Sequence, residues 1–271
     1  MKIVKIERKN FEEMNLPETL YKYRDWEKVN NRTILTERQV YFAPPDSFDD
    51  KDDCKIPVRW DLLTDQEIFQ IYYQDSRLTN QEFTRKQHRQ FAREWTEISP
   101  MKDKEYLKEK MEQDFADFNR SFGILSLTSK STNLDLWINY SNNHKGFAVG
   151  FDPLIVFKYF GGGGPVEYYS ELPIINPHPF HSYEEQHFLK VFSKLEKCRF
   201  EDEYRIQKFK LSELTLNDRL VKLPAEGYKE IILGAFIDNE IKKDLLNSIP
   251  QELKEISVRQ AKIVENKIEI E

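Results

Sequence analysis

The sequence predicts an α+β protein built on a mostly antiparallel, twisted sheet with a helical segment inserted into it. Short β-prone runs bounded by turn residues occur on both sides of residues 64–120. Residues 64–120 themselves are rich in Gln, Glu, Lys and Arg, with no Gly and a single Pro. We therefore expect one α+β domain over residues 1–271, with a helical insertion at about 64–120.

The first half of the chain shows both periodicities. Alternating apolar and polar residues predict a strand at 20–24, and a second β-prone run at 39–43 ends at a pair of prolines. Between them, the spacing of Ile34 and Leu35 favours a helix. In the insertion, apolar residues at helical spacing predict helices at 64–76, 79–97 and 102–120.

The second half returns to β-prone runs. We expect strands at 122–128, 146–151, 166–169, 200–209, 230–236 and 256–270. Helices are expected at 131–143, 182–197 and 239–247. Four consecutive glycines at 161–164 predict a hinge or tight turn.

Composition excludes several classes of protein. Aromatic residues make up 13% of the 271 residues, which is enough apolar area for a core, and 9 Gly exclude a collagen-like chain. No run of about 18 apolar residues occurs, so we expect no membrane partner. The charged N-terminus lacks the apolar stretch of a secretory signal.

Charge and cysteine content indicate compartment and partners. A net charge of −6 argues against duplex nucleic acid as a partner, because phosphate binding needs clustered Lys and Arg. The two cysteines, Cys54 and Cys198, are too few for a disulfide framework. We expect both to be thiols in a reducing cytoplasm.

The densest group of candidate functional residues is Glu201, Glu203 and Arg205. On a strand they share one face, because side chains alternate. The arginine could hold one carboxylate ionised while the other acts on a substrate. The alternative interpretation is an exposed strand edge with an ion pair.

A second group surrounds the helix expected at 131–143. Trp137 and Tyr140 lie three residues apart and so share a helix face, and His144 follows where the helix ends. Tyr140 and His144 are candidate ligand-binding residues. The alternative is a set of core aromatics beside a capped helix end.

A third group is acidic. Five carboxylates within eight residues could bind a hard cation, but their spacing does not match an EF-hand, and a solvated loop is the alternative. We therefore assign no metal ligands. The five residues are Asp46, Asp49, Asp50, Asp52 and Asp53.

Three segments together resemble the bacterial domain of unknown function 2971. They are Phe48–Asp50, then Leu136-Trp137-x-x-Tyr140-x-x-x-His144-x-Gly146-Phe147, and then Phe200-Glu201-x-Glu203-x-Arg205. The similarity runs from about residue 18 to 210, and the strand-like runs at 20–24 and 40–43 fit its N-terminal strands. The chain departs from that family at Lys51, where proline is usual, and at Cys198, where tryptophan is usual. This resemblance implies no activity.

The order of three motifs also resembles ADP-ribosyltransferases of the Arg–Ser–Glu type. Arg24 comes first, then Ser126 within Ser126-Leu127-Thr128, where Ser-Thr-Ser is usual, and then Glu201-x-Glu203. The resemblance implies NAD as substrate, in a toxin or defence effector. Glu203 would bind the ribose and stabilise charge at the reacting centre, and Glu201 would orient or deprotonate the acceptor.

The resemblance also implies two binding roles. Arg24 would pair with the pyrophosphate, and Tyr140 would stack on nicotinamide. The expected polar centre therefore joins the carboxylates, Arg205, Tyr140 and His144, with Lys22 and Arg24 opposite.

Three functions stay open from the sequence. The first is an enzyme that transfers ADP-ribose from NAD or hydrolyses NAD. The second is a non-catalytic ligand- or protein-binding module whose helices at 64–120 dock a partner protein. The third is a metal-dependent nuclease or phosphoesterase that uses residues 46–53 together with Glu201 and Glu203.

Overall fold

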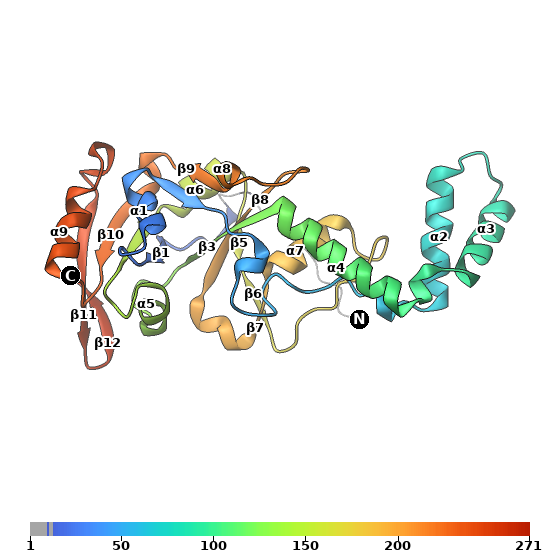
Figure 1. Cartoon of the computed structure of the whole chain (residues 1–271), viewed down its shortest axis with the longest axis horizontal. Helices are drawn as coiled ribbons and strands as arrows, with labels where there is room; N and C mark the ends of the chain where they lie inside the picture. Colours follow the sequence, from blue (N-terminus) through green and yellow to red (C-terminus); the bar gives the residue numbers. More distant parts are fainter. Residues whose placement is uncertain (1–9, 11–12) are drawn as a thin grey trace.

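The computed structural model describes residue 10 and residues 13–271 and has two visibly different parts (Figure 1). A twisted sheet with flanking helices forms the body. A pair of antiparallel helices projects from it at the far end of a long third helix. The α+β architecture predicted from the sequence is therefore confirmed.

The main sheet has eight strands. Their order is β12 (Lys267–Ile270), β11 (Ser257–Val264), β10 (Tyr228–Leu233), β4 (Phe147–Phe151), β1 (Leu20–Arg24), β3 (Phe122–Thr128), β8 (Glu203–Phe209) and β5 (Gly164–Pro165). Every neighbouring pair is antiparallel except β10 and β11, which run parallel. Two small two-stranded sheets pair β2 (Gln39–Tyr41) with β9 (Leu220–Lys222) and β6 (Glu167–Tyr169) with β7 (Ser193–Leu195).

The main sheet opens between two of its central strands. β1 pairs with β4 over all five of its residues, but it pairs with β3 only where Tyr21 faces Thr128. β3 in turn pairs with β8 over its full length, from Phe122 to Thr128. Where β1 and β3 separate, side chains replace the backbone ladder, and the Lys22 ammonium donates to the Ser126 carbonyl at 2.6 Å. The opening leaves room for a cavity within the sheet.

The body helices cover both faces of the sheet. They are α1 (Val29–Thr36), α5 (Leu134–Tyr140), α6 (Pro153–Phe160), α7 (Tyr183–Phe192), α8 (Leu216–Arg219) and α9 (Asn239–Asn247). One face carries the largest core cluster, which includes Leu35, Phe147 and Phe157. The other face carries a smaller cluster, in which Trp137 of α5 meets the Tyr23 ring edge-on at 4.9 Å.

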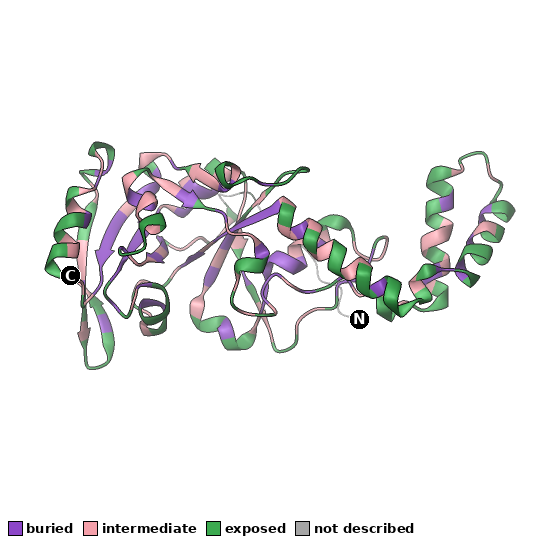
Figure 2. Cartoon of the chain, in the orientation of Figure 1, coloured by how far each residue is buried: buried purple, intermediate pink, exposed green. Residues whose placement is uncertain are grey.

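The projecting part consists of α2 (Asp65–Thr79) and α3 (Arg85–Glu97), joined to the body by α4 (Lys104–Ser121). Capping boxes begin α2, at Thr64 and Glu67, and α3, at Thr84 and Gln87. These two helices are mostly exposed, in contrast to the central strands (Figure 2). The inner end of α4 is anchored by Phe118, which packs on Phe122.

Several expected elements differ in the structure. The helix expected at 182–197 ends at Phe192, because the next three residues pair with β6. The strand expected from residue 200 begins at Glu203, since 196–201 forms a 3₁₀ turn and Asp202 is left-handed. The strand expected at 256–270 is a hairpin, because Glu265 and Asn266 form a left-handed turn. The helix α6 was not expected.

No helix in the described part of the chain combines the length and apolar character needed to cross a bilayer.

Gly146 lies between α5 and β4 and packs closely against the backbone of Arg24 at the end of β1. A Cβ at this position would lie 2.1 Å from the Arg24 carbonyl oxygen, whereas a Cβ on Gly162 would meet nothing within 4 Å. We predict that Gly146→Ala lowers the free energy of unfolding by about 3 kcal/mol. Gly162→Ala should change it by less than about 0.5 kcal/mol. Urea unfolding of both variants checks this, and equal midpoints would contradict the close approach.

Candidate functional site

The cavity of about 140 Å³ lies where β1 and β3 separate. Its wall comes from these two strands, the start of β8, α5, β7 and the loop at 48–53. Six of the eight residues predicted from the sequence line it: Lys22, Arg24, Ser126, Tyr140, Glu201 and Glu203. Arg205 and His144 are the two that do not.

Arg205 lies fully buried beneath the cavity and organises its base. Its Nε and Nη2 atoms donate to the two carboxylate oxygens of Glu203 at 2.7 and 2.9 Å, which is a bidentate pair. Nη2 also lies 2.8 Å from the carboxylate of Asp53. Nη1 donates to the Val191 carbonyl and lies 3.0 Å from the Cys54 sulfur.

Lys194 of β7 joins the three carboxylates of the site. Its ammonium lies 2.5 Å from Glu201, 3.1 Å from Glu203 and 3.3 Å from Asp53. Glu201 precedes β8 and reaches the site from the 3₁₀ turn, so the two glutamates meet at Lys194 instead of sharing a strand face. The two glutamates thus lie together as expected, but through their shared contact with Lys194 and not through alternation along one strand.

The two glutamates have opposite protonation tendencies. Burial opposes ionisation of Glu203, but Arg205 and Lys194 outweigh it and lower the Glu203 pKa to about 2. Burial raises the pKa of Glu201, and its share of the Lys194 charge offsets this only in part. Glu203 is thus held as a carboxylate, while Glu201 is the group better suited to exchange a proton.

Two cations line the cavity without a carboxylate partner among the described residues. Lys22 donates to a backbone carbonyl, and Arg24 donates to its own neighbour, the Tyr23 carbonyl, at 3.2 Å. Burial, and then the Arg24 charge, hold the pKa of Lys22 well below its usual value. Burial lowers the pKa of Arg24 to about 10, so it stays charged at neutral pH. Arg24 is thus the permanent charge of this wall and favours an anionic ligand, beside which Lys22 can take up a proton.

Hydroxyl and aromatic groups complete the cavity. The buried Ser126 hydroxyl faces Glu203 and helps to lower its pKa, and it makes no hydrogen bond of good geometry within the described residues. Tyr140 is half exposed, and partial burial together with the nearby Glu201 charge raises its pKa to about 12. The Phe48 ring lies 5.6 Å from the Arg205 guanidinium.

His144 does not lie in this cavity. It is buried in a left-handed turn, where its ring stacks on Trp137 at 6.2 Å and meets Phe236 at 5.7 Å. Burial lowers its pKa. The left-handed turn after α5 directs the His144 side chain into the aromatic cluster. The prediction from helix spacing was therefore wrong for this residue, because the helix ends before it.

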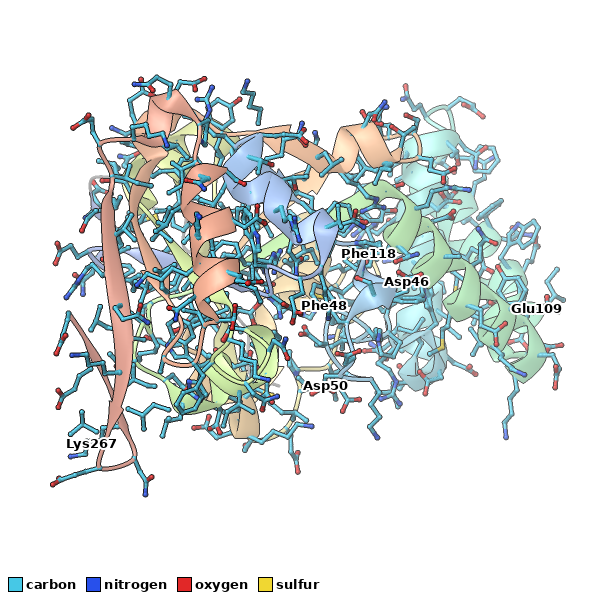
Figure 3. All side chains as sticks on the ribbon, turned by 60° about the vertical axis from the view of Figure 1, so that its left-hand side comes forward. Asp46, Phe48, Asp50, Glu109, Phe118 and Lys267 are labelled. Carbon is cyan, nitrogen blue, oxygen red and sulfur yellow. The ribbon has the colours of Figure 1, made fainter. Side chains whose placement is uncertain are left out.

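The acidic loop divides into exposed and buried residues. Asp46 and Asp50 lie on either side of Phe48 along the loop (Figure 3), and Asp50 pairs with Lys197 at 3.3 Å. Asp53 turns inward and joins Arg205. Among the residues that the structure describes, no group of three or more His, Cys, Asp or Glu side chains is placed to hold a metal ion. The inner carboxylates are occupied by the ammonium and guanidinium groups instead.

Sequence reasoning missed Asp53 and Lys194 as members of the site. Nothing in its spacing distinguishes Asp53 from the four other aspartates of the acidic loop. Lys194 lies within the helix predicted at 182–197, so it was not considered beside Glu201 and Glu203. Cys54 and Cys198 are free thiols, as expected, and burial is the main cause that raises the pKa of Cys54.

Comparisons with known proteins add no relative. No family model, no curated protein and no solved structure matches the chain. Both resemblances drawn from the motifs therefore stay predictions.

Acid titration tests the ionised state of Glu203. Because its pKa falls from 4.5 to about 2 on folding, its contribution to stability is present above pH 4.5 and is lost as the pH drops through 2. We predict that the free energy of unfolding falls by on the order of 3 kcal/mol over this window through Glu203 alone. Folding raises the pKa of Glu201, so ionisation of this residue above pH 4.5 lowers the free energy of unfolding, which is the opposite effect.

Urea unfolding at a series of pH values makes the measurement. Glu203→Gln should flatten the slope between pH 4.5 and 2, whereas Glu109→Gln, at an exposed position of α4, should keep it. Equal slopes in all three proteins would show that Glu203 does not titrate as the ion network requires.

Proposed function

We propose that this cavity binds NAD and that the protein transfers its ADP-ribose to an acceptor or to water. One observation supports this most strongly: two basic side chains without a carboxylate partner among the described residues line the same cavity as a pair of unlike glutamates. An anionic ligand pairs with Arg24 and favours the protonated form of Lys22, and the glutamates act beside it.

The position of Arg24 suits a ligand with a central pyrophosphate. Arg24 lines the cavity at the strand opening and also a second cavity of about 340 Å³, whose polar wall includes Asn31 and Gln39. A dinucleotide has a ring system on each side of its pyrophosphate. It would place one half in each cavity, with its phosphates on Arg24, which offers planar bidentate hydrogen bonds.

The two glutamates then divide the chemistry. The bond between the ribose and nicotinamide breaks, and its electron pair leaves with neutral nicotinamide. Glu203, held as a carboxylate, accepts a hydrogen bond from the ribose and stabilises the positive charge that develops there. The acceptor oxygen or nitrogen bonds to the ribose carbon, and its proton passes to Glu201. Tyr140, at the rim, stacks on the nicotinamide ring.

A second candidate function is a non-catalytic binding module. Arg205 and Lys194 already contact both oxygens of Glu203, which limits its freedom to act. The projecting helices also expose large apolar residues, such as Leu78 on α2. In that case the helices at 64–120 would dock a partner protein, and the cavity would only recognise a ligand.

Nicotinamide release from NAD tests the enzymatic proposal. Wild-type protein, with cell lysate as a source of acceptors, should release nicotinamide. Glu203→Gln should reduce the rate by about 10²- to 10³-fold, because it removes the charge that stabilises the reacting ribose. Circular dichroism shows that the variant is folded, and the exposed Glu196→Gln serves as the matched control with unchanged release. No release from folded wild type, with or without lysate, would favour the binding module.

A further inference from the structure

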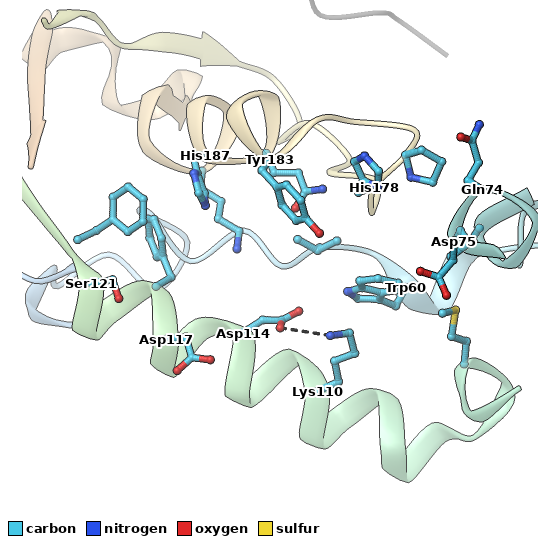
Figure 4. A pocket seen from close by; sticks show the side chains of 18 of the residues that line it. Trp60, Gln74, Asp75, Lys110, Asp114, Asp117, Ser121, His178, Tyr183 and His187 are labelled. Carbon is cyan, nitrogen blue, oxygen red and sulfur yellow. Dashed lines mark hydrogen bonds and ion pairs between the residues drawn. The ribbon is translucent and has the colours of Figure 1, made fainter. Parts of the chain in front are cut away.

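A larger cavity of about 610 Å³ lies away from the carboxylate site, between α4 and α7 (Figure 4). Trp60 forms its floor, Asp114 and Asp117 project from α4, and Tyr183 and His187 project from α7. The proposed NAD reaction uses none of these residues. The cavity therefore requires its own explanation.

Lys190 of α7 lines this cavity under unusual conditions. The residue is only 8% exposed, and no hydrogen bond or ion pair of its ammonium occurs within the described part of the chain. Its Nζ is not among the fully buried unpaired atoms, so the amine reaches the open space of the cavity. Its one close partner is the Phe118 ring, at 5.2 Å from Nζ. Lys194, four residues later, is equally buried but has three carboxylate partners. A buried amine without such partners is favoured in its neutral, nucleophilic form.

The charged groups around the cavity support this state. Asp114, the nearest carboxylate of α4, is already paired with Lys110 at 3.4 Å, and Asp117 is paired with Arg120 at 2.6 Å. Burial lowers the pKa of Lys190, and Asp114 offsets this only in part. The remaining titratable groups of the lining are Tyr72, Asp75, His178, Tyr183 and His187.

His187 lies three residues before Lys190 and thus on the same face of α7. Burial is the main cause that lowers its pKa, so its ring is neutral at physiological pH. A neutral imidazole can both accept and donate a proton.

We propose that Lys190 is a nucleophilic amine that forms an imine with a small uncharged aldehyde or ketone bound in this cavity. The Nζ lone pair forms a bond to the carbonyl carbon, and the carbonyl oxygen takes up a proton. The oxygen then leaves as water, and the nitrogen loses its second proton as the C=N bond forms. Amine and carbonyl thus give imine and water with no change of oxidation state, and His187 carries the protons.

The lining also defines the class of carbonyl compound. The rings of Trp60, Phe118, Phe122 and Phe209 favour an aromatic or apolar substituent. Asp114 and Asp117 present only acceptor oxygens, which cannot hydrogen-bond to a carboxylate or phosphate on the ligand. An uncharged aromatic aldehyde therefore fits better than an anionic one.

Reductive trapping tests the proposal. The full chain is incubated at pH 7 with benzaldehyde and cyanoborohydride, and the labelled lysines are mapped by peptide mass spectrometry. Each unit by which a lysine pKa falls raises its neutral fraction about tenfold at this pH. We expect Lys190 to be labelled at least about tenfold more than Lys197, which is exposed and whose pKa Asp50 raises. Glyoxylate, an anionic aldehyde, should label Lys190 less than benzaldehyde does.

Two variants complete the experiment. Lys190→Arg keeps a long basic side chain but cannot form the imine, and it should lose the main adduct, whereas Lys197→Arg should keep it. Labelling that follows exposure over all lysines, or an unchanged main adduct in Lys190→Arg, would overturn the proposal. Mapping of the wild-type chain decides the matter even where a variant does not fold.

Discussion

The buried guanidinium of Arg205 connects parts of the chain that are far apart in sequence. It binds Glu203 on its own strand, Asp53 in the acidic loop and the Val191 carbonyl at the end of α7. A charge at this depth is tolerated only when its partners are complete, because removal of one leaves a buried charge uncompensated. The loop, the helix and the strand are therefore held in one arrangement, and the cavity above them takes its shape from that arrangement.

The same ion cluster determines which carboxyl groups of the cavity can exchange a proton. Two cations, Arg205 and Lys194, serve three carboxylates, so one carboxylate is less well neutralised than the others. That carboxylate is Glu201, whose pKa is raised, while Glu203 is held ionised. On the opposite wall, Arg24 carries a charge that pairs with no carboxylate of the described chain, and burial together with that charge lowers the pKa of the neighbouring Lys22. The cavity therefore places a cation, Arg24, near a carboxyl group, Glu201, that can exchange a proton.

The sequence predicted the sheet better than the connections between its strands. Alternation located β1, in which Lys22 and Arg24 share the less buried face, whereas β3 was expected as a β-prone run and is buried almost throughout. The order of the motifs predicted that Arg24, Ser126 and Glu203 lie together, and all three line the cavity. The failures occurred where tertiary contacts override local pattern. The local pattern predicts a helix over Ser193–Leu195, but these residues form β7 and pair with β6. Lys194 lies in the site as a result of this pairing. Asp53 contacts Arg205, 152 residues away, and local spacing carries no signal for such a pair.

The central claim is that the cavity at the strand opening recognises a pyrophosphate through Lys22 and Arg24. Calorimetric titration of ADP-ribose into the folded protein tests it without requiring catalysis. The account predicts binding to the wild type, loss of binding in the double variant Lys22→Met/Arg24→Met, and unchanged binding in Lys197→Met. No binding to folded wild type, or equal binding to the double variant, would contradict it.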